Sequence, residues 1–205
     1  MSRSFRALSL VACGVLVLLL GVTPSPAQIP ISEARDQGAG ATVTVEGTVT
    51  RAFGDFVRFQ DESGPTGASG LVVRQTSGNF RDAVQNGTIA QGTQLQVTGT
   101  LSEFNGLLQI NNPDLDDYDV QGQGSVPDPQ DVTLAELRAN GEDYESELVR
   151  VTDIDILNDQ GTFEKDTSYP SYPLTGTVDA ATLQEGTLAL RVQGSGETTL
   201  AGEPI

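Results

Sequence analysis

The sequence predicts an all-β protein organised around a small barrel, and two observations support this prediction. Apolar and polar residues alternate along 42–50 and 93–101, with the period of two that places one face of a strand in a core and the other in solvent. Asn105-Gly106 then separates the second run from a further alternating run at 107–110. Because both residues of this dipeptide tolerate positive φ, it favours a two-residue hairpin turn.

The first half of the chain carries the elements of one barrel in order. Ser32 can cap a short helix within 29–40, and Gly38 can end it. Gly47 lies in the middle of the first strand, where a strongly bent strand needs a residue without a Cβ. The expected strands are 42–52, 56–60, 71–75 and the two strands of the hairpin, with a weak helix at 79–90 between the third and the fourth. This order is that of a five-stranded OB-fold Greek-key barrel, so we expect 28–112 to form one OB-fold domain.

The second half begins with a change of composition. Residues 113–131 are rich in Asp, Gly and Pro and are expected to form an acidic linker. Thr133 and Glu136 then have the spacing of a capping box at the start of a short helix, and apolar residues from 148 to 156 predict a further strand. A new folded unit is therefore expected to begin near residue 132.

This second unit repeats the plan of the first in a shorter form. Three short motifs of the first half are echoed in the second: 31–35 by 134–138, 54–56 by 161–163 and 71–74 by 188–191. The repeat predicts a second OB-like β domain at 132–205, incomplete because the sequence given stops before a counterpart of the hairpin. The alternative, that 132–205 is a small β appendage of the first barrel, stays open.

The composition is strongly acidic. The chain has 28 Asp and Glu against 11 Lys and Arg, a net charge of -17. Residues 1–27 hold two Arg and no acid, so the rest has 28 acids against 9 bases, a net charge of -19. Such charge can prevent a core from forming, but the hydrophobic residues, 37% of the chain, are patterned, which favours a fold. An acidic surface with Arg in place of Lys is typical of proteins kept soluble in strong salt, as halophile proteins are.

The first 27 residues have the pattern of a secretory signal peptide. Two arginines precede an apolar run at 7–22, and residues 25–27 (SPA) form a small-residue site for cleavage after Ala27. The run is shorter than the ~20 residues that a spanning helix needs, so no stable membrane insertion is expected. The alternatives are an uncleaved anchor and a lipoprotein anchored at Cys13, which is disfavoured because the apolar run continues past that cysteine.

Four stretches, 45–49 (VEGTV), 59–61 (FQD), 92–99 (GTQLQVTG) and 103–110 (EFNGLLQI), carry a family resemblance. They resemble the OB-fold domains of secreted bacterial sugar-nonspecific nucleases and related large cell-surface proteins. The likeness covers residues 29–111 well and 133–205 loosely, and its motifs specify the barrel more than an activity. It implies an N-terminal accessory region of a larger protein. The family's catalytic residues lie in other domains, and no stretch here matches them.

The residues themselves point to a non-catalytic chain. His is absent and Cys13 falls within the predicted signal peptide, so Ser-His and Cys-His catalysis and His or thiolate zinc sites are not expected. There is no G-x-S-x-G motif and no P-loop. Lys165 lies between two acids, where a solvated ion pair is the ordinary outcome, and no glycosidase-type carboxylate pair can be singled out among 28 acids. We expect no cofactor and no metal.

The acidic run at 114–119 (DLDDYD) raises the question of calcium, which prefers oxygen ligands from alternate positions. The EF-hand pattern fails, because with Asn112 in first place Asp117 stands where Gly is required and Gln123 where Glu is required. A solvated acidic linker is the favoured interpretation, and binding of a divalent cation is left open.

One face of the predicted barrel has the chemistry for single-stranded nucleic acid. OB barrels bind single strands by stacking bases on exposed aromatic residues over a basic groove on the second and third strands. The candidate binding residues are Arg51, Phe53, Phe56, Arg58, Gln60, Arg74 and Phe104. The alternative, that the phenylalanines belong to the core and the arginines serve solubility, stays open.

The leading hypothesis is therefore a secreted OB-fold module that binds single-stranded nucleic acid weakly, beside downstream domains of the same polypeptide. A net charge of -19 repels phosphates, so binding would depend on local positive charge and on stacking. One rival is oligosaccharide binding on the same face, and another is a structural or adhesion module without nucleic-acid affinity. The fold alone cannot separate these functions.

Overall fold

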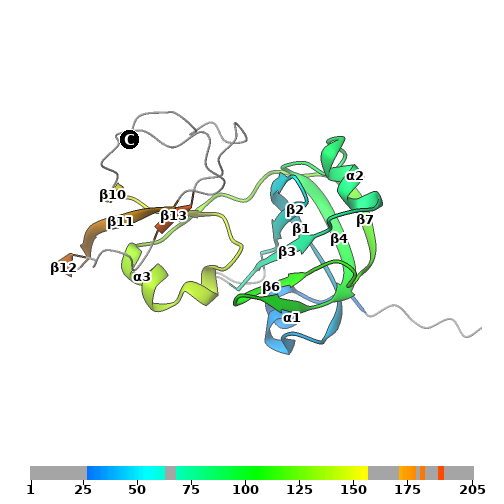
Figure 1. Cartoon of the computed structure of the whole chain (residues 1–205), viewed down its shortest axis with the longest axis horizontal. Helices are drawn as coiled ribbons and strands as arrows, with labels where there is room; N and C mark the ends of the chain where they lie inside the picture. Colours follow the sequence, from blue (N-terminus) through cyan, green and yellow to red (C-terminus); the bar gives the residue numbers. More distant parts are fainter. Residues whose placement is uncertain (1–26, 63–67, 157–170, 179–180, 183–188, 192–205) are drawn as a thin grey trace, which may run out of the picture.

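The computed structural model describes residues 27–62, 68–156, 171–178, 181–182 and 189–191 (Figure 1). The predicted signal peptide up to residue 26, Lys165 and the echo at 161–163 lie outside the described residues. Among the helices that the structure describes, none is long and apolar enough to cross a membrane.

The first half of the chain is an all-β OB-fold barrel. The long strand β1 (Thr42–Phe53) pairs antiparallel with β4 (Thr93–Thr100) along its first part and with β2 (Phe56–Gln60) along its second part. Strand β3 (Gly70–Arg74) pairs antiparallel with β2 and parallel with β6 (Leu107–Ile110). This shared first strand and the parallel closing pair confirm the predicted fold class.

The sheet closes because one strand continues into another. Strand β5 (Ser102–Phe104) follows β4 after Leu101 and forms the predicted hairpin with β6. The sheet order is β5-β6-β3-β2-β1-β4-β7. Strands β4 and β5 are consecutive in the chain but lie near opposite edges of this sheet, so their connection brings the two edges together and closes the barrel. Asn105 and Gly106 have φ of 52° and 85°, the two positive values that the predicted hairpin turn requires.

Glycine at position 47 lets β1 bend over its neighbour. A Cβ at Gly47 would lie 2.7 Å from the carbonyl oxygen of Gln60 and 2.9 Å from the Phe59 ring. The register of β1 on β2 also shifts between Val49 and Arg51, a β-bulge of the kind that bends barrel strands. Both features confirm the expectation that this strand bends strongly.

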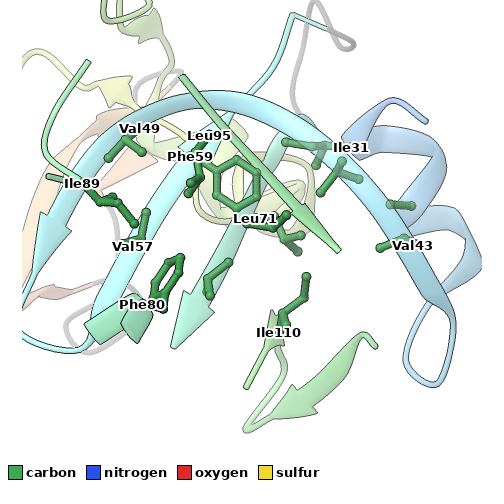
Figure 2. Packing of buried hydrophobic residues seen from close by; sticks show 14 of the residues in the cluster. Ile31, Val43, Val49, Val57, Phe59, Leu71, Phe80, Ile89, Leu95 and Ile110 are labelled. Carbon is green, nitrogen blue, oxygen red and sulfur yellow. The ribbon is translucent and has the colours of Figure 1, made fainter. Parts of the chain in front are cut away.

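The barrel core is formed by the apolar residues of the alternating patterns (Figure 2). Val43, Val45 and Val49 of β1 and Leu95 and Val97 of β4 are all buried in it. Each such side chain stabilises the fold by roughly 1.5–3 kcal/mol. The remaining large members of the core are Ile31, Val57, Phe59, Leu71, Val73, Phe80, Ile89, Leu101 and Ile110.

Two short helices pack against this core. Helix α1 (Ile31–Gln37) begins after Pro30 rather than at Ser32. The carboxylate of Asp61, which directly follows β2, accepts the N–H of Ile31 at 2.7 Å and so satisfies the first helical N–H. Helix α2 (Asn79–Gln85) ends earlier than the predicted residue 90. There the Asn86 side chain accepts the N–H of Thr88 at 2.9 Å, which forms a turn.

Residues 115–123 differ from the prediction, which placed them in the linker. They form β7 (Leu115–Gln123), which pairs antiparallel with β4. Tyr118 packs against the core, with its ring 5.1 Å from that of Phe80 in a T-shaped arrangement. The pairing has a register shift opposite Thr98 and Gly99. Because of this bulge, the core-facing residues Leu115 and Tyr118 are three positions apart instead of two. The sequence therefore lacks the regular apolar–polar alternation of a strand at this point.

The second half of the chain has smaller elements. Helix α3 (Leu134–Ala139) has the predicted capping box, in which the Glu136 carboxylate accepts the N–H of Thr133 at 2.7 Å. The helical turn η1 (Gly141–Tyr144) follows it. The strands are β8 (Gln130–Asp131), β9 (Val149–Arg150), β10 (Ile154–Ile156), β11 (Ser171–Val178), β12 (Ala181–Thr182) and β13 (Ala189–Arg191).

These strands form two small sheets. Strands β8 and β9 pair in parallel, while β11 pairs with β10, β12 and β13. Much of 157–205 lies outside the described residues, so the proposed repeat of the first domain stays a prediction.

Candidate binding groove

Six of the seven predicted site residues line one hollow on the barrel, which we call the groove. It has a volume of about 990 Å³ and is bordered by β1, β2, β3 and the β5–β6 hairpin. The six predicted residues that line it are Arg51, Phe53, Phe56, Arg58, Arg74 and Phe104. The structure therefore brings together side chains that are spread over more than fifty positions of the sequence.

Strand register places these side chains next to one another. Val57 and Phe59 are buried in the core, so the alternation of β2 turns Phe56 and Arg58 outward into the groove. Phe56 lies directly opposite Phe53 on β1 and Arg74 on β3. Directly opposed residues of an antiparallel pair have adjacent side chains, so the groove is a direct product of the pairing.

Two arginines lie over two phenylalanine rings. The Arg74 guanidinium carbon is 5.1 Å from the centre of the Phe56 ring, and that of Arg51 is 5.6 Å from the centre of the Phe53 ring. Both distances allow a cation–π attraction. Arg74 also forms a 3.5 Å ion pair with Asp55. Its buried Nε has no hydrogen-bond acceptor among the described residues.

Arg58 is the most confined cation of the groove. Burial lowers the pKa of its guanidinium, the charge of Arg51 lowers it further, and Glu145 raises it. The group nevertheless stays protonated, as arginine does in proteins. Among the residues that the structure describes, its guanidinium has no ion pair within 4.0 Å and no hydrogen-bond acceptor. Its donors are thus available to a ligand.

Gln60 does not line the groove, in contrast to the sequence prediction. Its side chain is buried, and its Oε1 accepts the N–H of Leu148 at 2.8 Å. It borders a different hollow of about 720 Å³, beside Glu46 and Asp61. Its polar group serves a contact within the protein.

Phe104 is the large apolar side chain most open to solvent among the described residues, at 60% exposure. It lies beside the hairpin turn at the rim of the groove. An aromatic ring held in water by a tight turn can stack on a planar ligand without first leaving a core.

Sequence reasoning missed several residues of the groove. Leu107 and Gln109 come from β6, and Gln91 lies just before β4, where its side-chain amide donates to the Thr50 carbonyl at 3.2 Å. Glu147 and Leu148 come from the second half of the chain. The hairpin pattern places Leu107 opposite Phe104 and Gln109 opposite Ser102, but no local pattern shows that 147–148 return to the barrel.

The structure provides no metal centre among the described residues. No group of three or more His, Cys, Asp or Glu side chains comes together there. The acidic run at 114–119 leads into and along β7, where Asp116, Asp117 and Asp119 are exposed.

Comparison with known proteins adds little beyond the fold. No family model and no curated protein sequence matches the chain. Solved structures that resemble it include the hypothetical protein ygiW from E. coli, with 15% identity over 48% of this chain and 91% of that one and a TM-score of 0.34. Two others are aspartyl-tRNA synthetases, the putative enzyme of Leishmania major Friedlin and that of Entamoeba histolytica.

The Leishmania enzyme has 13% identity over 60% of this chain and 26% of its own, with a TM-score of 0.36. The Entamoeba enzyme has 18% identity over 51% and 23%, with the same TM-score of 0.36. The chain thus spans about a quarter of the length of these synthetases. These likenesses are slight, and the assignment as an OB-fold barrel rests on the strand pairing itself.

Proposed function

We propose that this chain is a non-catalytic OB module that binds single-stranded nucleic acid in the groove. The observation that carries the proposal is that strand register gathers three arginines and three phenylalanines on one concave surface. Aromatic rings accept bases of any sequence, at roughly 1–3 kcal/mol per stacked base. The arginines supply the local positive charge that phosphates need on an otherwise acidic protein.

The unsatisfied donors of the groove support an anionic ligand. Arg58 has no ion-pair partner among the described residues, and the buried Nε of Arg74 has no acceptor there. Buried donors normally have partners, because leaving one unpaired is costly. A phosphate oxygen in the groove would provide an acceptor for the Nε of Arg74 and an anionic partner for Arg58.

The wider role in the proposal is that of an accessory domain. The signal-peptide pattern and the resemblance to OB-fold domains of secreted nucleases support a secreted module that holds substrate for other domains of the same polypeptide. Catalysis would then belong to those domains, since no catalytic constellation is recognisable here.

A second candidate is oligosaccharide binding in the same groove. Gln91 and Asn105 are exposed residues with side-chain amides, and they line the groove together with Phe53 and Phe104. Aromatic faces with amide groups around them also suit sugar rings, and OB barrels bind oligosaccharides on this face. A structural or adhesion module would bind neither ligand.

Fluorescence anisotropy tests the proposal. Chain 28–205, the form that remains after the predicted cleavage, would be titrated into a labelled oligothymidylate of about ten nucleotides, a length within the range of one OB fold. Saturable binding that falls in Phe56→Ala and Arg58→Ala supports the groove as the site. Arg138→Ala is the matched control, because Arg138 is exposed on α3, outside the groove.

The same titration separates the candidates. Folded protein that does not bind the oligonucleotide from low to molar salt would contradict the proposal. If a panel of labelled oligosaccharides then binds and the Phe56 variant does not, the second candidate is favoured. Absence of both leaves the structural or adhesion role.

A further inference from the structure

Residues 142–148 (EDYESEL), which we call the strap, comprise most of η1 and the segment from η1 to β9, and they lie against the barrel (Figure 1). The strap contains four acidic residues in seven positions. It contacts the barrel at α1, at the start of β3 and at β6, and its last two residues line the groove.

Two carboxylates anchor the strap. Glu145 forms a 3.0 Å ion pair with Arg35 of α1 and accepts the N–H of Leu108 at 3.2 Å. Glu147 accepts both the N–H and the hydroxyl of Ser69, at 2.6 and 2.8 Å. The strap thus uses acidic side chains to satisfy donors of the barrel.

The backbone of the strap also lies close to the barrel. Arg35 donates to the Glu142 carbonyl at 3.2 Å. Gly70, at the start of β3, has no room for a side chain. A Cβ there would lie 2.7 Å from the carbonyl carbon of Ser146 and 2.8 Å from the backbone carbonyl oxygen of Glu145. Contact this close requires glycine at position 70.

The strap adds negative charge to the cationic groove. Glu147 lines the groove. The charge of Glu145 also reaches Arg58, where it partly offsets the lowering of the guanidinium pKa by burial and by Arg51. The carboxylates therefore stand near the place where a phosphate would lie. A phosphate backbone in the groove would be repelled by these carboxylates.

The strap is held by polar contacts more than by apolar packing. None of its residues belongs to the buried core, and all seven are half-buried or exposed. Segments with few buried apolar contacts open at a lower free-energy cost than the whole fold. Detachment of the strap can therefore occur while the barrel stays folded.

We propose that the strap is an intramolecular acidic competitor that lowers the affinity of the groove for single-stranded nucleic acid and is displaced when that ligand binds. The inference rests on the proposed function and adds regulation of the same site. Because coupling between two binding events is reciprocal, whatever detaches the strap strengthens ligand binding, and the ligand in turn detaches the strap.

Gly70→Ala tests this without changing any charge, because the new Cβ would push against the strap backbone. Gly141→Ala is the matched control, since a Cβ at Gly141 would meet nothing within 4 Å. In chain 28–205, we expect Gly70→Ala to bind the labelled oligothymidylate about fivefold more tightly or better, and Gly141→Ala to bind like the parent. Glu145→Gln, which keeps an acceptor for Leu108 but loses the charge, should change affinity in the same direction.

Hydrogen exchange gives an independent reading of the strap. The amides of Ser69 and Leu108 donate to the strap carboxylates, so they should exchange faster in Gly70→Ala and faster in the parent chain once the oligonucleotide is bound. Circular dichroism of each variant establishes that the barrel is folded.

The outcomes distinguish the two proposals. Faster exchange in Gly70→Ala with unchanged or weaker oligonucleotide binding would overturn the strap as a competitor and leave the groove as a binding site. If hydrogen exchange in Gly70→Ala is unchanged, that variant has not detached the strap, and Glu145→Gln becomes the test. An oligonucleotide affinity of Glu145→Gln equal to that of the parent would then overturn the inference. If neither the parent nor any variant binds, both proposals fall together.

Discussion

Arg51 and Arg58 lie directly opposite each other on β1 and β2, so two like charges share one face of the barrel. Opposed like charges on neighbouring strands are destabilising. The charge of Arg51 accordingly lowers the pKa of the Arg58 guanidinium, which burial has already lowered. Arg58 has no compensating ion pair among the described residues, so an anion bound beside the two arginines would relieve their repulsion.

The first prediction separates stability from binding at this pair. Arg58→Met keeps the aliphatic stem and removes the confined charge, so the free energy of unfolding should stay unchanged or rise by up to about 1 kcal/mol. Oligonucleotide affinity should fall in the same variant. Urea denaturation and anisotropy measure the two quantities. A clear loss of stability would mean that Arg58 serves the fold instead.

The second prediction concerns the bend of β1. Gly47→Ala should destabilise the barrel by about 1–3 kcal/mol, because the Cβ would stand 2.7 Å from the Gln60 carbonyl oxygen and cannot be relieved by a flexible side chain. Gly141→Ala provides the comparison, since its Cβ meets nothing within 4 Å. Equal denaturation midpoints for the two variants would show that β1 accommodates a side chain at this bend.

Local patterns made much of the fold predictable. The alternation of 56–60 matched β2 at both ends, and the Asn105-Gly106 dipeptide marked the hairpin turn. The capping box formed by Thr133 and Glu136 depends on residues three apart and is present as predicted. In each case the signal and the structure lie within a few residues of one another.

Features that depend on distant contacts were not predictable. Strand β7 has a bulge that interrupts its alternation, so its Asp and Gly residues have the composition of a linker. The buried side chain of Gln60 accepts the N–H of Leu148, which lies 88 positions further along the chain, so no local pattern could show this contact. The strap is missed for the same reason, since Glu145 and Glu147 acquire their roles only when the chain returns to Arg35 and Ser69.

The third prediction tests whether β7 belongs to the barrel. Tyr118→Ala should destabilise the barrel by about 1–3 kcal/mol, because it removes a ring that packs on the core and contacts Phe80 at 5.1 Å. Asp117→Ala, one residue earlier and exposed, should change stability by less than about 0.5 kcal/mol. If both substitutions change stability by a similarly small amount, the segment is a linker and not a strand of the barrel. Urea denaturation followed by far-UV circular dichroism measures the difference in the free energy of unfolding.

The fourth prediction concerns the α3 capping box and pH. Hydrogen bonds from the backbone and then the side chain of Thr133 lower the pKa of Glu136. The carboxylate form is thus favoured in the folded helix, so this contribution is present above the pKa of the unfolded chain and is lost as pH falls through the lower folded value. An NMR titration should show the Glu136 pKa rising in Thr133→Ala, but only in part, because the backbone N–H remains.

The last prediction uses salt to count phosphate contacts. Binding that weakens as salt rises indicates contacts between phosphates and local cations of this otherwise acidic protein. For a single strand, each phosphate contact contributes about 0.7 to the steepness with which log K falls against log salt. Arg58→Ala should therefore make that slope shallower by nearly one contact, whereas Phe56→Ala should weaken binding with the slope retained, because stacking releases no counterions. Glu145→Gln removes a charge of the strap, so its oligonucleotide affinity should exceed that of the parent at low salt, whereas the affinity of Arg58→Ala should be lower. At high salt the affinity of Glu145→Gln should approach that of the parent, because charges are screened there. Slopes that do not differ between Arg58→Ala and Phe56→Ala would mean that the arginine does not meet a phosphate, and would favour a neutral ligand such as an oligosaccharide.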